Sequence, residues 1–184
     1  IIFSAGSAIA QEHRSIHELE SEEYSRGKKV ALVQPEAETS FSPPLNMARA
    51  AAKSLTKHVI GWNPYWTGTA YTSFDYSLLS TVAYFSYEVD TATGSYTTIH
   101  YWKTTELLPL AHENGTRVVL TVTNFGNANN AAILNSPAKQ KVLIDSLIAL
   151  IKLRNADGVN IDFESITDKT LRPKLTVLRR FNGN

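Results

Sequence analysis

The chain has 184 residues, of which 43% are hydrophobic and 19% are charged, and its formal net charge at pH 7 is +1. This length and composition are typical of one globular domain with a buried core. A charge so close to zero gives no electrostatic reason to expect a nucleic acid or an anionic membrane as partner. The absence of cysteine excludes disulfides, thiolate metal sites and cysteine nucleophiles.

The first ten residues are predicted to be the end of a secretory signal peptide. Residues 1–10 are small and apolar, and they end in Ala8-Ile9-Ala10, an Ala-x-Ala cleavage pattern. We expect the chain to begin inside this signal, because an initiating Met and a basic segment are missing. The alternative is a buried or frayed terminal segment. The signal predicts a secreted or periplasmic protein. No run of about 18 apolar residues follows, so no membrane span is expected.

Residues 11–57 are predicted to be a leader or linker of low order. The first part of this segment is rich in Glu, Ser, Arg and Lys, and the second part contains Pro35, Pro43 and Pro44 among Glu, Thr and Ser. Such a composition supplies few residues for a core. The folded domain is therefore expected to begin at His58.

Residues 58–184 are predicted to alternate between strands and helices. The expected strands cover residues 59–62, 81–87, 117–124 and 157–164, and the expected helices cover residues 105–113, 137–154 and 167–180. A turn at 90–94 leads into a short hairpin arm at 96–101, and an Asn- and Ala-rich loop is expected at 126–135. The third strand is a dense β-branched run, which is typical of a strand buried in a parallel sheet. Strand–helix–strand order predicts an α/β fold.

Two features lie at the C-terminal ends of the expected strands. Trp62, Tyr65 and Trp66 cluster at the C-terminal end of the first strand. Aromatic faces can stack on sugar rings, or these side chains can simply cover the end of the sheet or pack in the core. Asn124 ends the third strand, where a polar side chain can either reach a ligand or only terminate the strand.

The last expected strand reads Asp-Gly-Val-Asn-Ile-Asp-Phe-Glu from Asp157 to Glu164. Its period of two puts Asn160, Asp162 and Glu164 on one face, with neighbours about 6.6 Å apart along the strand. Like charge and desolvation both raise a carboxyl pKa, and a general acid must be protonated near neutral pH. The alternatives are a solvated face of an edge strand and a site for calcium or magnesium, although the glycine-turned ligand loop of an EF-hand is absent.

This stretch resembles the signature Asp-Gly-x-Asp-x-Asp-x-Glu of glycoside hydrolase family 18, the chitinases and their relatives. Asp157, Gly158, Asp162 and Glu164 match it, and Asn160 replaces the first Asp of its core. The resemblance implies a (β/α)8 TIM barrel. Such a barrel typically needs about 250 residues, so only about the first four β/α units are expected in this chain, and residues 58–184 are expected to form the N-terminal half. This portion alone is expected to be inactive.

The resemblance also implies a mechanism, in which the 2-acetamido oxygen of the substrate attacks the anomeric carbon and configuration is retained. Glu164 would protonate the leaving oxygen and then act as base toward water. Asp162 would orient the acetamido group and stabilise the oxazolinium intermediate. Asn160 can hydrogen-bond Asp162 but cannot exchange a proton, which implies an altered pH–rate profile. Asp157 is expected to tie the strand entrance, and Gly158 to permit close packing.

The resemblance assigns the remaining site residues as well. The first strand of the family often ends in a Gly-aromatic-x-Pro-x-Trp run, which implies a sugar subsite at Trp62, Tyr65 and Trp66. Asn124 would lie at the rim near the substrate. The Thr-Asn ending of its strand is similar to the branch that includes spore and peptidoglycan-associated members. No cofactor and no metal are implied, and the implied partner is an N-acetylglucosamine-containing polysaccharide.

Three classes of function follow. The first is a secreted glycosidase acting on β-1,4-linked N-acetylglucosamine in chitin or chito-oligosaccharides, with a peptidoglycan-directed N-acetylglucosaminidase of the same family as its alternative. The second is a non-catalytic lectin, although lectins of the family usually lose the acid that Glu164 supplies. The third is a structural barrel, which is disfavoured because packing does not demand Asp162 and Glu164 on one face. The sequence leaves the oligomeric state open.

Overall fold

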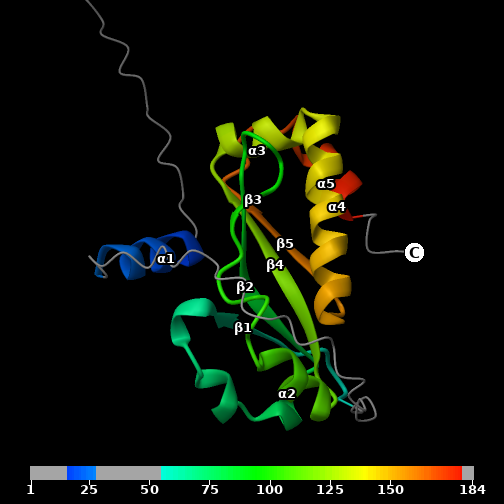
Figure 1. The fold of residues 1–184 in the computed structure, drawn as a ribbon. Helices are drawn as coiled ribbons and strands as arrows, with labels where there is room; N and C mark the ends of the chain where they lie inside the picture. Colours follow the sequence, from blue (N-terminus) through cyan, green and yellow to red (C-terminus); the bar gives the residue numbers. More distant parts are fainter. Residues whose placement is uncertain (1–15, 28–54, 180–184) are drawn as a thin grey trace, which may run out of the picture.

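The computed structural model describes residues 16–27 and 55–179, and it places the side chains of the last helix as far as residue 176 (Figure 1). The predicted signal residues 1–10 and most of the predicted leader lie outside the described residues. Within the leader, helix α1 spans Ile16–Gly27. The low order predicted for residues 11–57 is therefore not what this part of the leader shows.

Four parallel strands form the sheet. They are β1 (Ile60–Pro64), β2 (Thr81–Val89), β4 (Arg117–Phe125) and β5 (Gly158–Glu164), in the order β1-β2-β4-β5. Each of these four strands therefore pairs in parallel with the next of the four along the chain. This arrangement confirms the α/β class, and the strand bounds agree with the sequence-based ones to within two residues.

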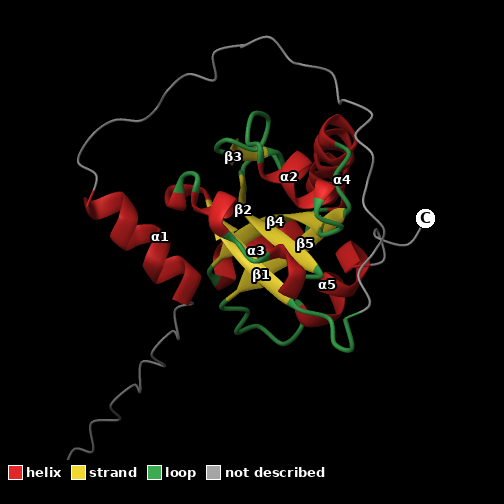
Figure 2. Ribbon diagram, turned by 90° about the horizontal axis from the view of Figure 1, so that it is seen from below, coloured by secondary structure: helices red, strands yellow, loops and turns green. Residues whose placement is uncertain are grey.

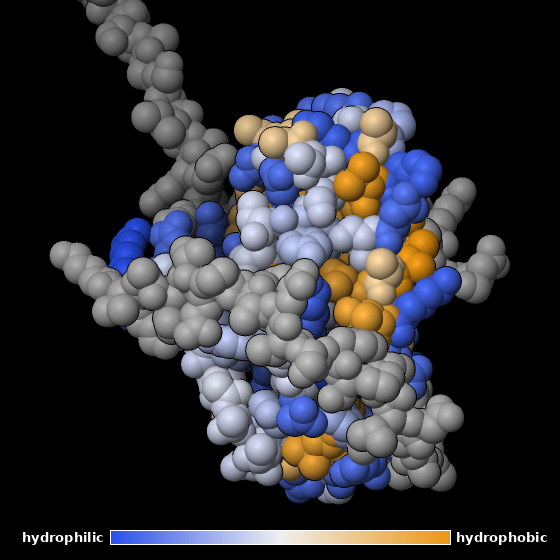
Figure 3. Space-filling model, viewed as in Figure 1, coloured by the Kyte–Doolittle hydropathy of each residue, from blue (hydrophilic) through white to orange (hydrophobic). Residues whose placement is uncertain are grey.

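Helices cover one face of this sheet. Helix α4 (Pro137–Arg154) and helix α5 (Arg172–Arg179) lie on the side opposite α1 (Figures 1 and 2). Helix α4 begins where the Ser136 side chain accepts a hydrogen bond from the Lys139 backbone, and it ends at Asn155, whose left-handed conformation stops the helix. Figure 3 shows that hydrophobic surface near α4 is broken up by hydrophilic side chains.

The core lies between the sheet and the helices. Its buried members come from alternate positions of the strands and from the inner faces of helix α2 (Leu107–Glu113) and α4. They include Val82, Tyr84, Val118, Leu120, Val122, Leu107, Leu108, Ala111, Leu143, Leu147 and Leu150. The intervening positions of β4 and β5 face away from α4 and are largely polar. This opposite face is where the acidic side chains of β5 lie.

A hairpin extends β2 beyond the parallel sheet. Strand β3 (Tyr96–Thr98) pairs antiparallel with the end of β2, and the Asp90 carboxylate accepts hydrogen bonds across the predicted turn. Gly94 has a φ of 89°, and a Cβ there would lie 2.4 Å from the carbonyl oxygen of Lys139. Only glycine fits this turn. The arm is shorter than predicted, because the chain turns after Thr98 and buries Ile99.

Two predictions about helices are wrong. The loop expected at 126–135 is instead helix α3 (Asn127–Leu134), because Ile133 and Leu134 pack into the core and Asn130 is buried. Helix α5 begins five residues later than expected, since the Asp168 carboxylate accepts hydrogen bonds from the Thr170 backbone and hydroxyl and closes a turn there.

Short 3-10 helices connect β1 to β2. They are η1 (Tyr65–Thr67), η2 (Ala70–Ser73) and η3 (Tyr76–Leu78). Among the helices of residues 16–27 and 55–179, none combines the length and the apolar character needed to cross a membrane.

Candidate active site

The register of the sheet aligns the candidate site residues in rows. Thr121 of β4 pairs with Asn160 of β5, Thr123 with Asp162, and Phe125 with Glu164. Paired residues of neighbouring parallel strands point to the same face. Asn160, Asp162 and Glu164 therefore share the face turned away from α4, and Glu164 stands at the C-terminal end of its strand.

The pKa of Glu164 lies well above the ordinary value of a glutamate. Partial burial raises its pKa to about 7, and a hydrogen bond with Asp162 and the negative charge of Asp162 act in the same direction. The carboxylate of Glu18, on α1, adds a smaller effect of the same sign. Near neutral pH the Glu164 carboxyl is thus protonated in a large share of molecules, so it can give a proton and can also take one back.

Asp162 has an open acceptor. Its Oδ2 atom is buried, and no described residue hydrogen-bonds to it. A buried oxygen without a donor costs free energy, and such atoms concentrate at functional sites. Asp162 can therefore accept a hydrogen bond from an N–H or O–H group of a ligand held beside Glu164.

Asn160 makes a different contact from the one expected. Its Nδ2 atom lies 3.5 Å from the hydroxyl oxygen of Thr121, on the neighbouring strand, rather than against Asp162. The Asn160 amide therefore points toward its paired residue on β4. Its effect on Asp162 is to supply a neutral neighbour where the family signature has a carboxylate.

A pair of asparagines holds the backbone of Glu164. The carbonyl oxygen of Glu164 accepts a hydrogen bond of 2.6 Å from Nδ2 of Asn130, and one of 3.2 Å from the Gly126 backbone. Asn124 donates to Oδ1 of Asn130 at 3.1 Å, and both asparagines are buried. The Asn124 side chain thus contacts α3, and its role as a substrate contact stays a prediction. Sequence analysis missed Asn130, since it lies in the segment taken for a loop.

Asp157 joins three elements at the opposite end of β5. Its Oδ2 lies 2.8 Å from Nε2 of His112 on α2, and it accepts a hydrogen bond of 2.8 Å from the Val118 backbone of β4. Gly158 follows with a φ of 149°, a value that favours glycine. A Cβ at Gly158 would meet Val119 at an ordinary 3.9 Å. Backbone conformation, rather than the expected close packing, is what requires glycine here.

Helix α1 packs on aromatic residues of β1 and of the turn that follows it. The ring of His17 lies 5.6 Å from that of Trp62, and the ring of Tyr24 stacks on Trp66 at the same centroid distance. Two of the three side chains predicted to bind sugar are therefore in contact with rings of the chain itself. Their role as a sugar subsite stays a prediction.

The third of these side chains, Tyr65, is also engaged. Its ring stacks on His100 with centroids 3.4 Å apart and an angle of 9° between the planes. Burial is the main cause that raises the pKa of Tyr65, followed by the charge of Glu88. Tyr65 therefore presents a neutral hydroxyl beside the hairpin.

The solved structures that resemble this chain include several chitinases. No family model and no curated protein matches the chain. A chitinase from Bacteroides thetaiotaomicron shares the fold with a TM-score of 0.60 and 21% identity, over 68% of this chain and 42% of that one. The C-terminal domain of a putative chitinase from Desulfitobacterium hafniense gives 0.55 and 25%, over 68% and 44%. A GH18 chitinase from Cycas revoluta in complex with (GlcNAc)3 gives 0.58 and 15%, over 67% and 39%.

The chain has a chitinase-like fold. It spans about two fifths of the length of these solved chitinases. The Asp157–Glu164 stretch resembles the chitinase signature, and the fold of the described sheet resembles that of solved chitinases. The two observations agree.

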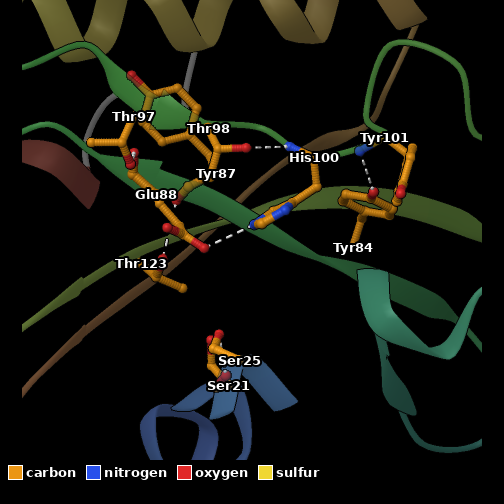
Figure 4. Close-up of polar contacts among 10 residues, drawn as sticks. All are labelled: Ser21, Ser25, Tyr84, Tyr87, Glu88, Thr97, Thr98, His100, Tyr101 and Thr123. Carbon is orange, nitrogen blue, oxygen red and sulfur yellow. Dashed lines mark hydrogen bonds and ion pairs between the residues drawn. The ribbon is translucent and has the colours of Figure 1, made fainter. Parts of the chain in front are cut away.

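An acidic cavity is lined by Thr123, the β4 partner of Asp162, and it was not predicted from the sequence. The cavity has a volume of about 300 Å³, and Glu88, Ser86 and Thr123 line it from the sheet, while Glu18 and Glu22 line it from α1. Oε1 of Glu88 lies 2.8 Å from Nε2 of His100, within hydrogen-bond distance (Figure 4). No sequence signal marks this pair, because the two residues are twelve apart and meet only when the hairpin folds.

The described residues contain no candidate metal centre. Within residues 16–27 and 55–179, no three His, Cys, Asp or Glu side chains gather in a way that could hold a metal ion.

Proposed function

We propose that this chain carries the catalytic acid of a secreted glycosidase that hydrolyses β-1,4-linked N-acetylglucosamine polymers with retention of configuration. The observation that carries the proposal is the Glu164 carboxyl, with a pKa of about 7, at the end of β5 beside Asp162. The chitinase-like fold supports it, as does the presence of (GlcNAc)3 in a neighbouring chitinase structure. The parallel strands would be the first four of a (β/α)8 barrel.

The first step breaks the glycosidic bond. Protonated Glu164 gives its proton to the leaving oxygen while the carbonyl oxygen of the 2-acetamido group attacks the anomeric carbon. The bond from that carbon to the leaving oxygen breaks, and a cationic oxazolinium ring forms. Oδ2 of Asp162, which no described residue engages, accepts the acetamido N–H and stabilises the positive charge.

The second step consumes the oxazolinium. Glu164, now a carboxylate, takes a proton from water, and the water oxygen adds to the anomeric carbon on the face from which the leaving group departed. The acetamido group is restored and configuration is retained. A pKa of about 7 suits a group that must act as acid and then as base in one cycle.

Peptidoglycan offers the same chemistry, since it also contains β-1,4-linked N-acetylglucosamine. The test therefore compares both substrates in the natural protein, with NMR reporting the anomer first released. Cleavage with retention, lost in Glu164→Gln, is the expected result. Glu113→Gln makes the same change on an exposed residue of α2 and should cleave like the unchanged protein.

Two results would overturn the proposal. Cleavage that survives Glu164→Gln would place the catalytic acid elsewhere. Sugar binding without cleavage in the unchanged protein would identify a lectin.

A further inference from the structure

Glu88 shares a row of the sheet with Asp162. Glu88 pairs with Thr123 of β4, and Thr123 pairs with Asp162 of β5. The three side chains therefore point to the same face, at the same height along the strands. Glu88 also lines the acidic cavity, and its side chain keeps 38% of its surface exposed.

His100 fixes the position of this carboxylate. Its Nε2 contacts Oε1 of Glu88 at 2.8 Å, and its own side chain is only 14% exposed. The ring is clamped by stacking on Tyr65, and the backbone nitrogen donates to the Thr98 hydroxyl at 3.0 Å (Figure 4). The backbone of His100 adopts a φ of 51°, which turns the ring back toward β2.

The cavity lining includes a further polar group that makes no hydrogen bond to the described residues. The hydroxyl of Ser86 is fully buried, lines the cavity and has no partner among the described residues. The charged residues in the lining are Glu18, Glu22 and Glu88, of which Glu22 is paired with Arg26 at 2.9 Å, and the described lining itself contains no Lys or Arg. Such a cavity suits a ligand that donates hydrogen bonds and carries no negative charge.

We propose that Glu88, held by His100, is a substrate-positioning residue that accepts a hydrogen bond from a hydroxyl of the sugar beside Asp162 and selects N-acetylglucosamine over a sugar in which that hydroxyl is replaced by an ether. This inference rests on the proposed function. Oε1 is taken by His100, which leaves Oε2 for the sugar. Muramic acid carries a lactyl ether in place of one hydroxyl, and the ether oxygen has no proton to donate to Glu88. Glu88 therefore favours chitin-type chains over peptidoglycan.

The test measures KM and kcat of Glu88→Gln in the natural protein, on chito-oligosaccharides and on peptidoglycan. The substitution keeps an acceptor oxygen but removes its charge, so the hydrogen bond weakens and KM for chito-oligosaccharides should rise about tenfold while kcat changes little. The ratio of kcat/KM on peptidoglycan to that on chito-oligosaccharides should increase. The pH at which activity falls should stay fixed, because Glu164 is untouched.

A second pair of variants tests His100 itself. His100→Gln keeps a side-chain donor for Glu88, whereas His100→Leu removes it. KM should rise less in His100→Gln than in His100→Leu, and circular dichroism should show both variants folded. A purely structural role for the pair would make both variants lose stability with no such order in KM.

Each outcome bears on a separate idea. If the unchanged protein cleaves chito-oligosaccharides and folded Glu88→Gln has the same KM and substrate preference, the role of Glu88 is wrong and the proposed function stands. If the unchanged protein neither cleaves nor binds N-acetylglucosamine oligomers in calorimetry, both fail. If it binds without cleaving, the affinity of Glu88→Gln replaces KM, and unchanged affinity overturns the role of Glu88.

Discussion

Nε2 of His112 lies 2.8 Å from Oδ2 of Asp157, and each of the two side chains is less than a tenth exposed. The pair fastens α2 to the start of β5, the strand that ends in Glu164. Removing one member of a buried pair leaves the other without its partner in a medium that solvates it poorly.

Asp157→Ala should lower the free energy of unfolding by roughly 3 kcal/mol, because His112 and the Val118 backbone both lose their acceptor. Urea denaturation measures the change. Asp145→Ala removes an exposed carboxylate that pairs with Lys141, and it should cost less than about 1 kcal/mol. Equal losses in the two variants would contradict the role of Asp157.

Glu164 makes stability depend on pH. In the folded chain its pKa is about 7, compared with an ordinary 4.5, so the folded state binds more protons between these values. The contribution to stability is full below pH 4.5 and is lost as the pH rises through 7. The melting temperature of Glu164→Gln minus that of the unchanged protein should therefore be higher at about pH 8 than at about pH 4. Glu113→Gln, the same change on an exposed residue of α2, is the control.

The pH dependence of the reaction rate is also expected to be set by Glu164. The value of kcat/KM should fall as the pH rises through about 7, because Glu164 loses the proton that it must donate. Asn160→Asp adds a third carboxylate to this face, and its charge should raise the pKa of Glu164 and move the fall in kcat/KM to higher pH. Asn160→Ser adds no charge and serves as control. An Asn160→Asp profile with both limbs unmoved would refute this coupling.

Asn130 positions the end of β5 through the backbone of Glu164. Asn130→Ala removes the 2.6 Å hydrogen bond to the Glu164 carbonyl and the contact with Asn124, so kcat should fall about tenfold with KM nearly unchanged. Steady-state kinetics measure both constants. Asn135→Ala, at the exposed C-terminal end of the same helix, should keep the original kcat. A matching fall in both variants would show a general effect on α3.

Helix α1 competes with any sugar that stacks on Trp66. Tyr24 already covers that ring with centroids 5.6 Å apart. Tyr24→Ala should therefore strengthen binding of N-acetylglucosamine oligomers about two- to tenfold, the value of one aromatic pair. Calorimetry measures the affinity, and Glu23→Ala, an exposed change on the same helix, is the control. Weaker binding in Tyr24→Ala would show that α1 helps to hold the sugar.

The sheet and the acidic face of β5 could be predicted from the sequence because both are local patterns. The alternation that ends in Asp162 and Glu164 specifies a face whatever the rest of the chain does. The β-branched run of β4 and the turn at Asp90 are equally local, and each was located to within two residues.

What could not be predicted depends on contacts between distant residues. Helix α3 contains asparagines of poor helix propensity and is held by the buried bonds of Asn130 to Asn124 and Glu164. The pairing of Glu88 with His100 depends on a register shift at the end of β2 and on a left-handed residue. Neither feature has a periodicity that could be read from the chain.

The chain contains three tryptophans, and their surroundings differ sharply. Trp102 is fully buried and donates its indole N–H to the Leu150 carbonyl, on the helical side of the sheet. Trp62 and Trp66 lie under His17 and Tyr24 of α1. Any movement of α1 would change the emission of two indoles and leave the third constant, so the protein carries a fluorescent reporter of its own N-terminal helix with an internal reference.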